Sequence, residues 1–133
     1  MIYPMFAMIL LTFCYGFYTA YCRVSMSLRG EINPKYFKTM SGYEVPEKIQ
    51  VTTRHFANLL ETPPLFYIAG ALIIALGIDS GTAETIGWVY VTARLAHMFI
   101  HNSYNHPVHR MIFFMLGLFC ILALWIIVLL HAG

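Results

Sequence analysis

Residues 54–66 read RHFANLLETPPLF and place polar side chains at the start of a hydrophobic stretch that runs to Gly77. Arg54, Asn58 and Glu61 stand at positions i, i+4 and i+7, so a helix carries all three on one face. Charged groups are costly in the hydrocarbon of a bilayer unless they are paired or hydrogen-bonded. This face is therefore the first candidate for a functional site.

The composition of the whole chain indicates an integral membrane protein. Of its 133 residues, 59% are hydrophobic and only 11% are charged, which is unlike the balance of a soluble domain. A membrane span needs roughly 20 apolar residues. Residues 2–22 and 111–131 each supply this length without one Asp, Glu, Lys or Arg, so two spans are predicted directly.

Two middle segments are long enough to span but carry ionisable side chains, namely Glu61, Glu84 and Arg94. Such residues predict spans with one polar face turned away from lipid. The predicted fold is an all-α, four-helix membrane bundle that forms a single domain over residues 1–133. Its expected spans are about 2–22, 56–77, 83–102 and 109–131.

The basic residues predict the orientation in the membrane. All eight Lys and Arg residues lie in or beside the first and third connections, at residues 23–53 and 103–108. Because basic connections stay in the cytoplasm, both termini and the turn at 78–82 are expected outside. The first segment has no basic residue before it and Arg23 after it, which favours a permanent anchor over a cleaved signal peptide. We favour a bacterial inner membrane, although a protein of the endoplasmic reticulum would show the same pattern.

The net charge of +2 is too small to indicate a nucleic-acid-binding protein. The basic residues are better explained by membrane topology and by an anionic ligand or lipid headgroup. The three cysteines lie in or beside apolar segments without the spacing of a metal site, so no disulfide framework is predicted.

The third expected span carries a second polar face. Arg94, His97 and His101 follow one another at i, i+3 and i+7, and this face is expected to look toward the second span. Arg110, at the start of the fourth span, is expected at the same membrane depth as Arg54. Two helix ends are therefore predicted to converge on one side of the membrane.

Pro63 and Pro64 follow Glu61 directly inside the second span. Proline removes a backbone donor and bends a helix, so a kink is expected here. The bend could serve only to fit neighbouring helices, or it could open the helix beside Glu61 and make room for a ligand. The sequence leaves both readings open.

The second expected span resembles the signature of the MAPEG family, the membrane-associated proteins of eicosanoid and glutathione metabolism. The matching residues are Arg54-x-x-x-Asn58-x-x-Glu61-x-x-Pro64-x-Phe66. A second motif is similar to the glutathione-using prostaglandin synthase branch, and the microsomal glutathione transferases belong to the same family. It consists of Arg94-x-x-His97-x-x-x-His101 and of Arg110, sixteen positions after Arg94. The resemblance covers most of the chain.

This resemblance implies a homotrimer of four-helix subunits that binds glutathione between adjacent subunits near the cytoplasmic surface. Arginines would pair with the carboxylates of the tripeptide, Asn58 would make a polar contact, and Glu61 would accept the ammonium group. The residues implied for glutathione binding are Arg23, Arg54, Asn58, Glu61, Arg94, His97 and His101.

Arg110 matches the family arginine that contacts the thiol, so the resemblance implies a catalytic role for it. Its fixed charge in a poorly hydrated site would favour the thiolate, which is the nucleophilic form. The implied activity is that of a glutathione-dependent transferase or peroxidase. Its substrate would be an apolar electrophile or a lipid peroxide that diffuses in from the bilayer.

Several positions depart from the characterised relatives. His101 and Thr62 stand where those relatives often have tyrosine, and Phe114 stands where the prostaglandin synthase has tyrosine. Ala57 replaces a residue that is often charged. Together these differences argue against an eicosanoid substrate.

Three alternatives remain open at the level of sequence. The arginines could pair with Glu61 only to hold the bundle together. The histidines at positions 97, 101, 106 and 109 could bind a transition metal, but no carboxylate follows nearby and Arg94 and Arg110 would repel a cation. The chain could also be a non-catalytic lipid-binding or partner-binding protein, since one member of the family presents lipid without using glutathione and fold alone does not fix function.

Overall fold

The computed structural model describes residues 1–132, which contain helices and no β-strand. This confirms the predicted all-α class, with helices long and apolar enough for a membrane bundle. The helices are α1 (Ile2–Leu28), α2 (Tyr36–Thr39), α3 (Glu47–Glu61), α4 (Pro63–Ala75), α5 (Gly81–Asn102) and α6 (Pro107–His131).

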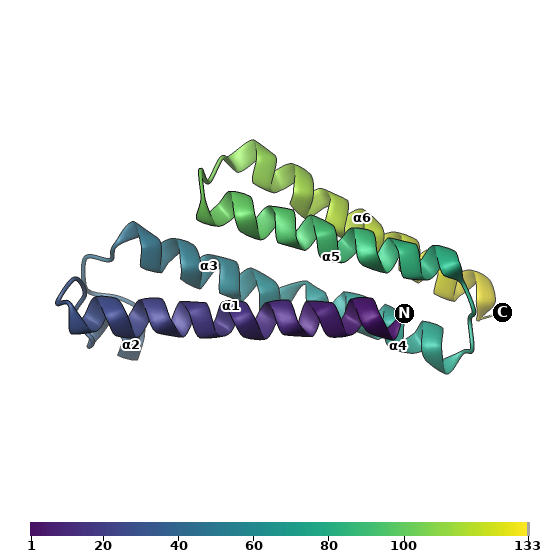
Figure 1. The fold of residues 1–133 in the computed structure, drawn as a ribbon, viewed down its shortest axis with the longest axis horizontal. Coiled ribbons are helices and arrows are strands. Elements are labelled where there is room, and N and C mark those ends of the chain that lie inside the picture. Colours follow the sequence, from purple (N-terminus) through teal and green to yellow (C-terminus); the bar gives the residue numbers. More distant parts are fainter. Residues whose placement is uncertain (133) are drawn as a thin grey trace.

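The long helices run along one common direction, with α4 continuing the path of α3 (Figure 1). The connections at residues 29–46 and 103–106 lie toward one end of the molecule, which we call the connection end. Both termini and the turn at residues 76–80 lie toward the other end, which we call the terminal end. The first and third connections therefore share a side, as the distribution of basic residues predicts.

The turn between α4 and α5 is closed by standard helix caps. Gly77 has a φ of +64°, and its N–H donates to the carbonyl oxygen of Ile74 while Ile78 N–H donates to that of Ile73. Glycine adopts this left-handed conformation at no steric cost. Ser80 Oγ then accepts a hydrogen bond from Ala83 N–H at 3.1 Å and begins α5.

The first connection is shorter than the expected loop 23–53. Helix α1 continues through Arg23 to Leu28, and α3 begins at Glu47, so the connection covers only residues 29–46 and includes α2. Arg23 lies within α1, and its guanidinium donates to Thr53 Oγ1 at 3.1 Å and ties α1 to α3. Helix α3 begins early because its buried residues recur every three or four positions, at Ile49, Thr52, His55 and Leu59.

The second expected span is interrupted where the two prolines predict a kink. Helix α3 ends at Glu61 and α4 begins at Pro63, with Thr62 between them. The prolines occupy the first two positions of α4, where a missing N–H costs little. Thr62 keeps the two helices in contact through a long N–H bond of 3.5 Å to the carbonyl oxygen of Asn58.

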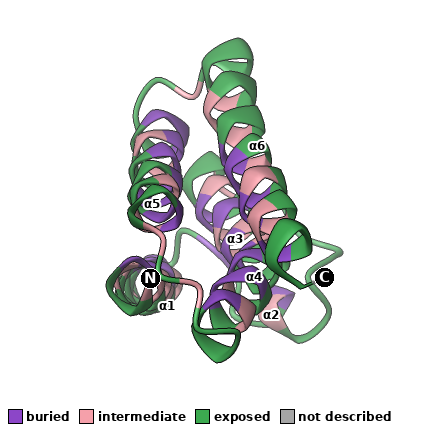
Figure 2. Ribbon diagram, turned by 90° about the vertical axis from the view of Figure 1, so that its right-hand side faces the viewer, coloured by how far each residue is buried: buried purple, intermediate pink, exposed green. Residues whose placement is uncertain are grey.

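The core runs between the helices, and the outward faces are exposed (Figure 2). At its centre the rings of Phe66 and Tyr90 stack with centroids 4.3 Å apart. The largest fully buried apolar side chains of the same cluster are Met8, Leu59 and Leu124, whereas Ile49 belongs to a smaller cluster with Cys22 and Ile32. Large apolar side chains also cover the outside, such as Phe17 at 73% and Phe119 at 65% exposure. An apolar exterior of this extent fits contact with lipid.

Three helices are long and apolar enough to cross a membrane, namely Ile2–Leu28, the joined α3 and α4 (Glu47–Ala75), and Pro107–His131. Helix α5 has 22 residues and packs most extensively along α6. It carries Arg94, His97 and His101 in its second half, toward the connection end.

Candidate functional site

A cavity of about 330 Å³ opens between α3, α5 and α6. It brings together five of the residues that the sequence singles out from three separate helices. The lining residues are Arg54, Asn58, His97, His101, Pro107, Arg110, Met111 and Phe114. Two of these side chains carry a fixed positive charge and none is acidic. The cavity is therefore suited to a ligand with negative charge, and we call it the cationic cavity.

Arg94 lies behind this cavity and is completely buried within the subunit. Its guanidinium donates to Asn58 Oδ1 at 2.7 Å, to Tyr90 Oη at 3.2 Å and to Thr62 Oγ1. It also lies 5.4 Å from the ring centroid of Phe114. The face that carries Arg94 is predicted to look toward the second span, and a single chain encloses Arg94 there. Arg94 therefore holds Asn58 in place at the cavity wall.

Arg110 stands in the first turn of α6 at the mouth of the cavity. One of its terminal nitrogens donates to Asn105 Oδ1 at 2.8 Å, while its Nε is buried without a partner. Asn105 adopts a positive φ of 48°, which asparagine tolerates better than most residues. The short connection thus orients Arg110 and leaves one buried donor available to a ligand.

Three histidines converge at the rear of the cavity. His97 and His101 line it, and His55 of α3 lies behind them, fully buried. The ring centroid of His55 lies 5.3 Å from the ring centroid of His97 and 5.1 Å from that of His101. We did not single out His55 from sequence. Its position beside Arg54, in a helix that also supplies cavity residues, is the only signal that could have found it.

Three of the implied ligand residues do not line this cavity, namely Arg94, which lies behind it, Arg23 and Glu61. Arg23 contacts Thr53 and the ring of Phe37, with its guanidinium 5.5 Å from the ring centroid. Glu61 is exposed on α3, and within residues 1–132 it makes no ion pair. The cavity of one subunit therefore unites Arg54, Asn58, His97, His101 and Arg110 but neither Arg23 nor Glu61. The pairing of Glu61 with Arg54 or Arg94, considered from sequence, is not formed.

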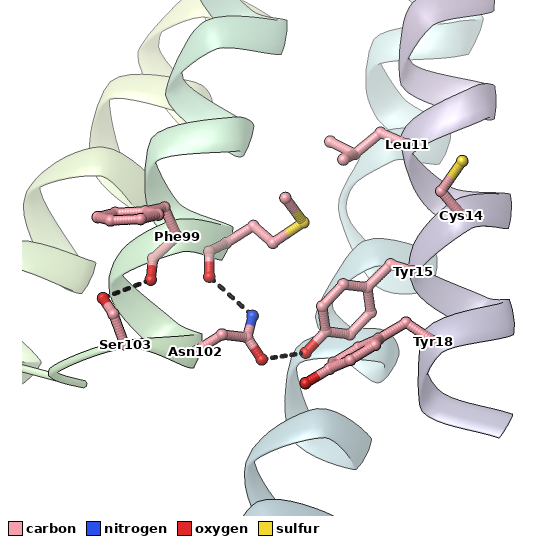
Figure 3. Close-up of a pocket in the computed structure, with 8 residues that line it drawn as sticks. Leu11, Cys14, Tyr15, Tyr18, Phe99, Asn102 and Ser103 are labelled. Carbon is pink, nitrogen blue, oxygen red and sulfur yellow. Dashed lines mark hydrogen bonds between the residues drawn. The ribbon is translucent and has the colours of Figure 1, made fainter. Parts of the chain in front are cut away.

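An apolar groove of about 440 Å³ lies between α1 and α5 (Figure 3). Its walls are Leu11, Cys14, Tyr15, Tyr18, Met98, Phe99, Asn102 and Ser103. At its polar end, Tyr15 Oη donates to Asn102 Oδ1 at 2.7 Å. Sequence reasoning missed this groove because lipid-facing and groove-facing apolar residues look alike along a helix.

A second polar pocket of about 400 Å³ lies beside the groove at the connection end. It shares Tyr18, Asn102 and Ser103 with the groove and His101 with the cationic cavity. Lys48 and Glu47 of α3 stand at its rim. The apolar groove and the cationic cavity are thus separated by one polar pocket, with His101 on the wall between pocket and cavity.

The four histidines considered as metal ligands do not come together in the described part of the chain. No group of three or more His, Cys, Asp or Glu side chains among residues 1–132 has the geometry to hold a metal ion. His106 and His109 form their own exposed pair, with ring centroids 4.6 Å apart, and Tyr104 contacts His109. They do not join His97 and His101.

Comparison with known proteins adds one finding. The family model described as the MAPEG family matches residues 1–130. No curated protein and no solved structure matches the chain.

Proposed function

Since the chain belongs to the MAPEG family, we propose that it is a glutathione-dependent transferase or peroxidase of the membrane. Its substrate class would be apolar electrophiles or lipid peroxides. The observation that carries this proposal is the cationic cavity, in which Arg54, Asn58, Arg110 and two histidines from three helices surround about 330 Å³.

The residues at the cavity fit an anionic tripeptide. Arg54 and Arg110 supply positive charge without an acidic neighbour on the wall, and arginine binds carboxylates through paired N–H groups. The unpartnered Nε of Arg110 adds a buried donor, and such donors are costly unless a partner satisfies them. We propose that Arg54 holds a carboxylate and that Arg110 stabilises negative charge on the sulfur.

Glu61 and Arg23 could reach the cavity only if several subunits assemble. An exposed carboxylate in a membrane helix is costly unless another group covers it, and Glu61 has no cationic partner within its own described chain. We propose a homotrimer in which a neighbouring subunit brings these residues to the cavity edge. There Glu61 would accept the ammonium group of glutathione and Arg23 would pair with its second carboxylate.

When bound, glutathione supplies a thiolate that can attack an electrophilic carbon or a peroxide oxygen. The protein contributes orientation, charge stabilisation and exclusion of water, which are sufficient for large rate effects. Arg94 positions Asn58 at 2.7 Å, and Phe114 and Met111 keep the cavity partly apolar. The groove of Figure 3 would hold the apolar part of the substrate on the lipid side.

We also propose that α5 spans the membrane as the third of four spans and that the connection end faces the cytoplasm. The basic connections support this orientation. Both termini would then lie on the opposite side, and the site would lie near the cytoplasmic face. A bacterial inner membrane remains our proposed location.

A second function is favoured by one observation, the size of the apolar groove. A lipid-binding member without catalysis would need the groove of about 440 Å³ but not the arginines of the cavity. Titration calorimetry with glutathione in detergent separates the two functions. We expect wild-type protein to bind at physiological millimolar concentrations and Glu61→Ala to bind about tenfold more weakly, a difference of about 1.4 kcal/mol.

The matched control for this titration is Glu31→Ala. Glu31 is also exposed, but it lies in the first connection with Arg29, 3.9 Å away, as its ion-pair partner. Its loss should leave glutathione binding unchanged. If wild-type protein releases no binding heat across the millimolar range, the glutathione proposal fails and the lipid-binding function takes its place.

A further inference from the structure

His55 is a polar residue in a place that offers it no partner. Its side chain is 0% exposed, and both ring nitrogens are buried without a hydrogen bond. A phenylalanine would fill a similar volume without this loss of hydration. Buried polar groups in folded proteins are nearly always satisfied, so His55 needs a partner that the described side chains do not supply.

The neighbours of His55 share the same condition. Nδ1 of His97 and Nδ1 of His101 are also buried and unpartnered. The centroids of the three rings form a triangle with sides of 5.1, 5.3 and 5.8 Å. Four of the six ring nitrogens in this triangle therefore lack a partner within one small region.

The other nearby polar groups are already engaged. Tyr15 contacts the His55 ring with centroids 4.5 Å apart, but its hydroxyl hydrogen is donated to Asn102. The guanidinium of Arg94 is occupied by Asn58, Thr62 and Tyr90. A neutral imidazole also needs both a donor and an acceptor as partners, which neither of these groups offers.

We propose that internal water binds the three rings, with a separate molecule at each nitrogen of His55, and that His55 is a positioning residue for His97 and His101. A buried water typically makes about three hydrogen bonds to groups that would otherwise be unsatisfied. Within residues 1–132 no hydrogen bond joins these rings to one another, and a water molecule beside His55 can bridge it to the other two rings. The water fixes which nitrogen of each ring carries hydrogen.

This assignment matters at the cavity, because His97 and His101 form part of its wall. A ring that is locked in one tautomer presents a fixed donor or acceptor to the ligand. His55 itself does not line the cavity, so it acts through the other two rings. The consequence for catalysis rests on the proposed glutathione function, whereas the water site does not.

Nuclear magnetic resonance of ¹⁵N-histidine-labelled protein tests the water site without any ligand. In wild-type protein, His97 and His101 should each show the ring-nitrogen shifts of one tautomer, with signals assigned by His97→Gln and His101→Gln. In His55→Phe, which has similar volume and no hydrogen bonds, both sets of shifts should move toward a tautomer mixture. His55→Gln, whose amide can hold the water, should restore single tautomers. Unchanged shifts in a folded His55→Phe protein would overturn the proposal.

A second measurement covers the case in which His55→Phe does not fold. Magnetisation transfer from water to the ring protons should be strong for the three buried rings of the wild-type protein. Its absence would also overturn the proposal. The exposed His131 at the end of α6 provides the reference signal for a histidine ring that is not buried.

Kinetics separate this inference from the proposed function. If wild-type protein turns over glutathione, His55→Phe should lower kcat about tenfold and leave the KM for glutathione within a factor of about two. An unaltered kcat in His55→Phe would remove the catalytic consequence. If wild-type protein shows no turnover but the tautomers respond to His55, the glutathione proposal fails while the water site stands.

Discussion

The two ends of the bundle are built differently. At the terminal end, α1 touches two glycines directly: a Cβ on Gly70 would lie 2.6 Å from Met5 Sδ, and one on Gly87 would lie 3.1 Å from Pro4 Cβ. At the connection end, a cationic cavity, a polar pocket and part of an apolar groove lie between the same helices. Small residues allow close packing at one end, and polar side chains line the cavities at the other.

This difference teaches how a small membrane protein can contain a site without losing its fold. Close contact between helices supplies packing where no chemistry is placed. Polar side chains such as Arg94 and His55 are gathered where the packing is looser, and Arg94 is satisfied inside the chain by three hydrogen bonds. Close helix packing is therefore found at the terminal end of the helices, and the candidate ligand site is found at their connection end.

The largest effect should come from Arg110→Ala at the connection end. Loss of the charge proposed to stabilise the thiolate should lower kcat/KM for an aromatic electrophile and glutathione about 100-fold to 1,000-fold. Thermal stability and oligomeric state should not change, because Arg110 is not part of the packed core. The control Arg29→Ala removes a charge that is 68% exposed. Full activity in Arg110→Ala would remove this residue from its proposed role.

Arg94→Met should lower the stability of the protein, because it removes the buried hydrogen-bond network between the two ends of the bundle. The change preserves much of the side-chain volume but leaves Asn58 and Thr62 without their donor. Lost hydrogen bonds to a buried charged group cost about 2–3 kcal/mol, which should appear as a lower Tm in thermal unfolding in detergent. Arg29→Met serves as the exposed counterpart. A Tm equal to that of wild type would show that the buried network contributes nothing.

The smallest effect should come from Gly70→Ala at the terminal end. The new Cβ forces the flexible end of Met5 to move, and overpacking of this kind costs about 1 kcal/mol. Gly81→Ala is the matched control, because no atom lies within 4 Å of its Cβ position. Thermal unfolding should therefore separate the two variants, with glutathione turnover equal in both. A greater loss of turnover than of stability in Gly70→Ala would contradict the division between the ends.

Much of the fold follows from sequence because hydrocarbon makes the apolar segments easy to recognise. The all-α class and the interruption beside Pro63 are confirmed by the helices observed. The ends of the first connection were harder to predict, because Arg23 could be taken as the end of a span. Arg23 instead lies inside α1 and donates to Thr53, 30 residues further along the chain, and the local pattern of residues does not reveal such a contact.

The candidate site was predictable where helical spacing determines direction. Arg54 and Asn58 share one face of α3, His97 and His101 share one face of α5, and all four line one cavity with Arg110 of α6. Spacing fails for Glu61, which shares the face of Arg54 but stays exposed outside the cavity. The position of His55 depends on how α3 packs against α1 and α5, which spacing within one helix does not reveal. The groove beside Tyr15 likewise depends on the distance between two helices. The ligand roles themselves stay predictions.

The interruption at Thr62 also separates the polar residues of α3 from the apolar residues of α4. Along an α-helix each residue adds about 100° of rotation, so an insertion in a continuous rod would turn every side chain beyond it. Here α3 and α4 meet at a joint instead. Recognition chemistry on α3 could therefore diversify by small changes of register while the lipid-facing surface of α4 keeps its own alignment.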